Sequence, residues 1–385
     1  MAVLHGKNYG KPSLDLNFAG NKSLIDTITR ANYVTFSRAQ SGNEATYVGS
    51  DGLIKYASAD EPRFDHDPET GESLGLLVEE SRTNYLSMFA SPSYNSSNSA
   101  TYSAYSDSRF GADQNAHSWT YASAQTNVEL GWINPGSINT TGNGVQYTVS
   151  GWIKANQAYA LRGNLIDERR QGINLDLDLT TEWQYFSLST PAGINDDGSG
   201  TVYFRWIRGN IAIPAGLRLD FAAINLERGG FPTSYIHTSG VVATRAADVA
   251  SITGTNFSNF YNNTEGTWFT DMALGFTQNA GNPFTFGGVY YTAFVNNFRT
   301  LGNQSIMGGL SNSQTIPSKT AVALKSQDFK VYRGGTQAGS NNSLSYTPTG
   351  TKWEINSSLG SLGRIKRVTY WPKRLPDIEL QQLTK

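Results

Sequence analysis

Short segments in which apolar and polar residues alternate recur along this chain. Residues 146–154, 175–179 and 217–226 follow this pattern, which is typical of strands with one buried face. Turn-forming sequences separate them, such as the Asn-Pro-Gly of residues 134–136 and the Gly-rich run at 196–200. Aromatic residues make up 12% of the chain and charged residues 16%, as in many turn-rich β proteins. We therefore predict an all-β fold with two antiparallel β-sandwich (jelly-roll) domains and a small N-terminal segment.

Residues 61–86 combine a turn, an apolar run and a charged exit, and they read EPRFDHDPETGESLGLLVEESRTNYL. Asp67-Pro68-Glu69-Thr70-Gly71 predicts a tight turn, because proline fixes one φ angle and glycine accepts a positive one. Residues 74–78 are apolar and too few for a helix, so they predict a short buried strand.

This stretch, together with the lead-in Thr46-Tyr47-Val48-Gly49-Ser50-Asp51-Gly52-Leu53-Ile54-Lys55, resembles a segment that recurs in structural proteins of tailed bacteriophages. The resemblance covers about forty residues. It implies a virion protein, assembled in the host cytoplasm, of the tail fibre or appendage type. Its implied partners are other virion proteins and sister chains, with a trimer as the expected homo-oligomer.

Further resemblances suggest the domain boundaries. Residues 86–240 resemble a jelly roll of the carbohydrate-binding-module type, and residues 253–385 resemble a concanavalin A-like (laminin G-like) domain. Residues 241–252 resemble an interdomain linker of phage tail proteins. Residues 1–85 would bury little apolar surface alone, so we expect this attachment and assembly segment to pack on another domain, another subunit or the virion.

Charge and composition argue against several classes of function. The net charge is −1 with no basic run, so we expect no nucleic-acid binding. No run approaches 18 apolar residues, so we expect no membrane insertion, and the first residues lack a signal-peptide core. Cysteine is absent, which excludes disulfides and thiolate metal sites.

No catalytic motif stands out, so we expect a protein without enzymatic activity. Residues 253–385 lack the Glu-x-Asp-x-x-Glu of concanavalin-like glucanases, and the chain has no Gly-x-Ser-x-Gly. Asp176 and Asp178 share one strand face, which we interpret as solvated. Asp65-His66-Asp67 could suggest a metal site, but turn chemistry is the favoured interpretation.

Asp220 is the candidate for a structural calcium ion, the one cofactor considered. Jelly-roll binding modules often hold such an ion through an acid on the last long strand, and Asp220 matches that position by resemblance. The alternative is that Asp220 is a cross-strand partner for Arg205 or Arg218.

Aromatic side chains are the candidates for sugar binding, because their rings stack on the apolar faces of pyranoses. The alternative for each is the sandwich core, since alternation turns half of them inward. The selected positions are Trp132, Trp152, Trp206, Tyr290 and Tyr291.

These observations predict a structural component of a tailed-phage virion, a tail fibre or appendage protein that contacts host surface glycan without catalysis. The alternatives are a capsid-decorating or scaffolding protein with no ligand and, third, a polysaccharide depolymerase.

Overall fold

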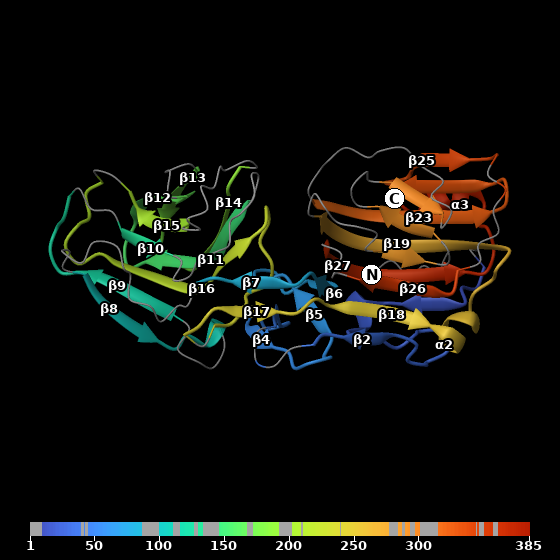
Figure 1. Cartoon of the computed structure of the whole chain (residues 1–385), viewed down its shortest axis with the longest axis horizontal. Helices are drawn as coiled ribbons and strands as arrows, with labels where there is room; N and C mark the ends of the chain where they lie inside the picture. The colour runs from blue at the N-terminus through green and yellow to red at the C-terminus, as the bar shows by residue number, and fades with distance from the viewer. Residues whose placement is uncertain are drawn as a thin grey trace.

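The computed structural model confirms the all-β fold and shows two lobes side by side (Figure 1). No described helix is long and apolar enough to cross a membrane. The structure describes residues 10–39, 42, 45–86, 100–110, 116–126, 130–133, 146–167, 172–191, 202–208, 211–238, 240–276, 284–286, 289–292, 297–300, 315–343, 345, 350–356 and 361–385.

The first lobe is a sandwich that we call the insert sandwich, spanning β8 to β16. One sheet has the order β14-β11-β16-β9-β8 and the other β10-β15-β12-β13. Aromatic and aliphatic side chains, Trp119, Trp206 and Phe221 among them, fill the space between the sheets. The strands are β8 (Ala100–Tyr105), β9 (Ala116–Tyr121), β10 (Leu130–Ile133), β11 (Tyr147–Ala155), β12 (Tyr159–Asp167), β13 (Gly172–Leu179), β14 (Gln184–Ser189), β15 (Val202–Ile207) and β16 (Arg218–Arg228).

The second lobe is built from both ends of the chain, and we call it the composite sandwich. Its larger sheet has the order β25-β24-β23-β19-β27-β6-β5, with β1 also pairing β27, and its smaller sheet has the order β2-β18-β26-β20-β21-β22. The strands are β1 (Leu14–Leu16), β2 (Thr35–Ser37), β5 (Arg63–His66), β6 (Ser73–Glu79), β18 (Val249–Thr253), β19 (Glu265–Phe276), β20 (Phe284–Phe286), β21 (Val289–Thr292), β22 (Asn297–Thr300), β23 (Thr315–Lys325), β24 (Phe329–Arg333), β25 (Thr336–Asn341), β26 (Lys352–Asn356) and β27 (Ser361–Trp371).

The N-terminal segment completes the composite sandwich. Strand β1 pairs β27 with Leu14 opposite Tyr370, and β6 pairs the same strand with Leu76 opposite Ile365. Strand β2 pairs β18 in the other sheet. The boundary expected at residue 85 therefore separates strands that lie in one sheet, and residues 86–240 interrupt a sandwich formed by the sequence on either side.

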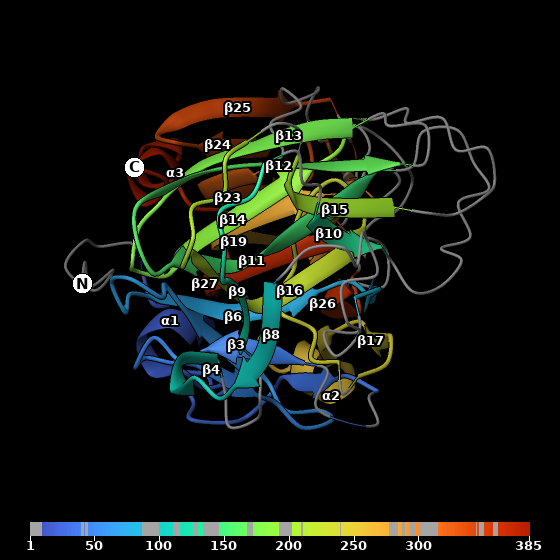
Figure 2. The same cartoon turned by 90° about the vertical axis from the view of Figure 1, so that its left-hand side faces the viewer.

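Two small two-stranded ribbons lie between the lobes. Strand β7 (Arg82–Asn84) leads into the insert sandwich and pairs β17 (Ala243–Arg245), which leads out of it. The second ribbon is the hairpin of β3 (Thr46–Val48) and β4 (Ile54–Tyr56). Viewed along the long axis, β3 and β4 lie on the same side of the molecule as α1 and α2 (Figure 2).

Helical segments are short: α1 (Phe18–Asn21), η2 (Ser108–Phe110), α2 (Gly254–Ser258) and α3 (Asp377–Leu383). Leu380 and Leu383 of α3 join an apolar cluster with Phe269 and Trp371, outside the main core of the composite sandwich. In that core, Trp268 and Tyr370 lie 4.6 Å apart between ring centroids.

Candidate functional site

Trp152 lies on the outer face of the five-stranded sheet of the insert sandwich. It is 8% exposed, because Phe110 and Tyr185 pack against it and the Arg109 guanidinium lies 4.7 Å from its ring centroid. Ile54 of the β3–β4 hairpin packs against the same cluster. The N-terminal segment therefore covers part of a sheet face that sequence alone left open to solvent.

The other predicted aromatic residues lie elsewhere. Trp206 is fully buried between the two sheets and packs on Trp119 and Phe221, so it is a core residue with no surface for a sugar. Trp132 is in β10, and Tyr290 and Tyr291 are in β21, but their side chains lie outside the described residues.

Asp220 is fully buried and hydrogen-bonded to neighbouring side chains. Its carboxylate accepts hydrogen bonds from Ser118 Oγ at 2.5 Å and from Arg218 Nη2 at 2.9 Å. Asp220 therefore pairs with Arg218, as the alternative to calcium predicted, but the two residues lie on one strand, β16, and not across strands. Within the described residues, no three His, Cys, Asp or Glu side chains gather as a metal site would need.

Asp176 and Asp178 lie on a solvated face, as the alternation of their strand predicts. Their side chains are 53% and 89% exposed, and Arg162 approaches both at 3.6–3.9 Å. Exposed pairs of this kind contribute little to stability.

A cleft of about 570 Å³ lies between the outer sheet face and the N-terminal segment. This volume falls in the range of small-ligand sites. The insert sandwich, the β3–β4 hairpin, the 65–74 region and β27 all contribute. Polar and aromatic side chains of its lining are Tyr47, Asp65, His66, Asp67, Glu69, Glu79, Ser150, Trp152, Tyr185, Ser234 and Arg364.

Tyr185 provides an aromatic surface in this cleft. It is 51% exposed, and its ring meets that of Trp152 edge to face with 5.5 Å between centroids. Burial of its hydroxyl raises the pKa of Tyr185, while hydrogen bonding to Ser150 opposes the rise. Tyr185 is therefore half exposed, with its hydroxyl hydrogen-bonded to Ser150. The alternation of β14, in which Phe186 and Leu188 are buried, is the sequence signal that places Tyr185 on the outer face.

Another wall of the cleft comes from residues 65–69 of the N-terminal segment. Asp65 Oδ1 accepts from the Val48 amide at 2.8 Å, and Oδ2 accepts from Arg364 Nε at 2.6 Å. His66 is 5% exposed, and its Nδ1 lies 3.0 Å from the Val48 carbonyl oxygen. These contacts tie β5 to β3 and hold the wall in place.

The turn at residues 67–71 has the predicted chemistry. Asp67 Oδ1 accepts from the amides of Glu69 and Thr70 at 3.0 and 2.8 Å, and Gly71 has φ +68°. The same backbone hydrogen bonds lower the pKa of Asp67. Its carboxylate thus stays charged, while Glu69 points from the same turn into an exposed position.

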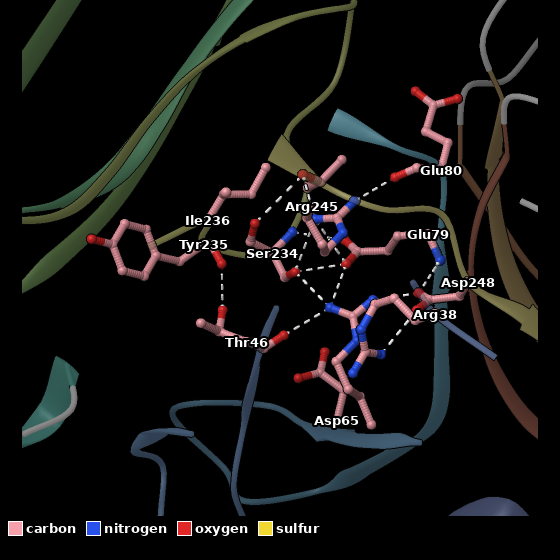
Figure 3. A network of polar contacts seen from close by, with 12 residues as sticks. Arg38, Thr46, Asp65, Glu79, Glu80, Ser234, Tyr235, Ile236, Arg245 and Asp248 are labelled. Carbon is pink, nitrogen blue, oxygen red and sulfur yellow. Dashed lines mark hydrogen bonds and ion pairs between the residues drawn. The ribbon is translucent and has the colours of Figure 1, made fainter. Parts of the chain in front are cut away.

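Behind the cleft, a buried network of ion pairs ties the N-terminal strands of the composite sandwich to the segment that leads out of the insert sandwich (Figure 3). Glu79 meets Arg63 Nη1 at 2.7 Å and Arg245 Nη1 at 3.2 Å. Asp248 pairs with Arg38 at 3.0 Å and also with Arg63. All five side chains are at most 1% exposed.

Ser234 connects this network to the insert sandwich. Its amide and hydroxyl donate to the two oxygens of Glu79 at 2.7 and 2.6 Å, and Arg63 Nη1 donates to its Oγ at 2.8 Å. Thr46 Oγ1 donates to the Tyr235 carbonyl at 2.6 Å. The wall and the sheet that face each other across the cleft are thus fixed to one another.

Acid is expected to weaken the junction formed by the Glu79 ion pairs and the hydrogen bonds from Ser234. Burial alone would raise the pKa of Glu79, but Arg245, Arg63 and Ser234 outweigh it and lower the pKa from 4.5 to about 2. A lowered pKa stabilises the fold above the ordinary value, and this stabilisation is lost as pH falls from 4.5 towards 2. The free energy of unfolding, measured by urea titration across this window, should fall. The Glu79→Gln variant should show a shallower fall, and an equal fall in both would contradict the assignment.

Comparisons with known proteins place the chain in no family. No family model matches it, and no curated protein matches it. One similar solved structure, described as "CBM4 structure and function", is 17% identical, with a TM-score of 0.25. The match covers 34% of this chain and 79% of that chain. The phage-virion and concanavalin A-like resemblances therefore stay predictions.

Proposed function

We propose that this chain is a structural component of a tailed-phage virion that binds a host surface glycan in the cleft between its two sandwiches, without catalysis. The observation that carries the binding proposal is the half-exposed aromatic side chain of Tyr185, which lines one cleft together with polar side chains of the N-terminal segment. A sugar ring offers an apolar face for stacking and hydroxyl groups around its edge, and the cleft has a surface for each.

The fixed junction supports this proposal. Glu79, paired with Arg63, accepts hydrogen bonds from Ser234 just beyond the last strand of the insert sandwich, so a ligand would not have to order the two walls on binding. Such preorganisation increases affinity by reducing the entropic cost of association. Weak sites repeated on an oligomer would add avidity, which suits a particle that meets a cell surface.

The charges of the cleft support binding rather than hydrolysis. A glycosidase needs two carboxyl groups that flank the scissile bond. Here Asp65 and Glu79 are each engaged by arginine. Asp67 and Glu69 stand on one turn, two residues apart, rather than on facing walls.

Substitution of Tyr185 should test the site. Tyr185→Ala is expected to weaken glycan binding about tenfold, because stacking is lost with the ring. Tyr185→Phe should keep most of the affinity. Screening the intact protein on a glycan array, followed by calorimetry with the best ligand, would measure both.

Tyr102→Ala is the matched control, since Tyr102 is 37% exposed on the same sheet and is not among the cleft residues. Unchanged affinity in Tyr185→Ala would overturn the site. No binding by the intact protein would favour the scaffolding alternative, and clearing of a host lawn would favour the depolymerase. Electron microscopy of labelled virions would test the place of the chain in the particle.

A further inference from the structure

The cleft carries a surplus of negative charge at one wall. Arg364 is paired with Asp65, and Glu79 is paired with Arg63 and Arg245 behind the surface. Neighbouring exposed charges are also paired, as Lys366 is with Glu72 and Lys55 is with Asp51. Among the described residues that line the cleft, Asp67 and Glu69 form no ion pair, although the charge of Arg364 acts on Asp67.

The same wall is rich in hydrogen-bond acceptors. Because His66 Nδ1 faces a carbonyl oxygen, it carries the proton, and Nε2 is then an acceptor. Nε2 is buried and has no partner within the described part of the chain. The carboxylates of Asp67 and Glu69 thus offer acceptors on one wall of the cleft that Tyr185 also lines, while His66 Nε2 is buried.

We infer that the cleft selects a sugar that bears a free amine and rejects acidic sugars, an inference that rests on the proposed glycan binding. An ammonium group offers three donors and a positive charge to the 66–69 wall while the pyranose ring stacks on Tyr185. A uronic or sialic acid would bring a carboxylate against Asp67 and Glu69, and the charge of Arg364, the arginine that lines the cleft, is already offset by its ion pair with Asp65. Glu69 is the residue that we assign to specificity, since it is exposed and its carboxylate is unpaired within the described residues.

Three oligosaccharides of equal length would test this inference on the intact protein: a β-1,4-glucosamine oligomer, its N-acetylated form and an oligogalacturonate. Calorimetry should show the amine bound about three- to fivefold more tightly than the N-acetylated form, the size typical of an exposed ion pair, and the acid bound weakest. The preference should shrink as salt rises, because the wall is solvent-exposed.

Glu69→Gln should remove the amine preference and leave binding of the N-acetylated sugar unchanged. Glu182→Gln is the control, since Glu182 is exposed on the insert sandwich and is not part of the cleft lining. Equal binding of the amine and N-acetylated forms, or an unaltered preference in Glu69→Gln, would overturn the selectivity alone. Failure of all three sugars to bind would overturn it together with the proposed function.

Discussion

Replacing Glu79 with glutamine should lower the free energy of unfolding by about 3–5 kcal/mol, the usual cost of breaking a buried ion pair from one side. Glu79 is fully buried, and its carboxylate accepts from Arg63, Arg245 and Ser234. The amide would leave two buried guanidinium groups short of one negative charge and would turn a donor towards them. Urea denaturation at neutral pH, followed by tryptophan fluorescence, would measure the loss.

Glu227→Gln is the matched control for this prediction. Glu227 is equally buried, but its contacts are mainly with Thr233, whose amide donates to Oε2 at 3.0 Å. Burial raises the pKa of Glu227, so the fold already favours its neutral form. We expect this variant to lose less than about 1 kcal/mol. Equal losses in the two variants would show that burial alone, rather than pairing with arginine, makes Glu79 important.

The junction also shows which part of the fold could be predicted from sequence. Local patterns were sufficient for the turn at 67–71 and the strand after it, because both depend on neighbouring residues. The charged exit at Glu79 and Glu80 resembled a solvated end, yet Glu79 is fully buried. Its partner Arg245 lies 166 residues further along the chain, and no local periodicity reports such a contact.

The candidate site was predictable in part for the same reason. Alternation correctly separates the residues of β14 into a buried and an exposed face. It would also have placed Trp206 on the buried face with Phe204, had it been known which residues of β15 point inward. It could not show that the N-terminal hairpin covers Trp152, because that packing joins residues about one hundred positions apart. The cleft lies between the insert sandwich and the N-terminal segment, so the local sequence pattern of either one alone does not predict it.

The composite sandwich gives the second large expected effect: residues 243–385 should not fold alone. Seven buried apolar residues of its core come from the N-terminal segment, namely Leu14, Leu16, Phe18, Val34, Phe36, Leu76 and Val78. Burial of each contributes about 1.5–3 kcal/mol, so removing all seven costs roughly 10–20 kcal/mol. This cost is at least as large as the free energy of unfolding of a typical domain. The fragment would also expose the edge of β27 where β1 and β6 pair.

A chain that keeps residues 10–85 and 239–385, with a short Gly-Ser linker in place of residues 86–238, should fold. The two ends of the deleted insert lie together, since Thr238 Oγ1 donates to the Leu86 carbonyl at 3.1 Å, so a short linker can close the gap. Dispersed amide resonances and a cooperative thermal transition in this chain, and their absence in residues 243–385, are the expected result. A cooperative transition in the isolated 243–385 fragment would show instead that the N-terminal strands are an addition to a sandwich that is complete without them.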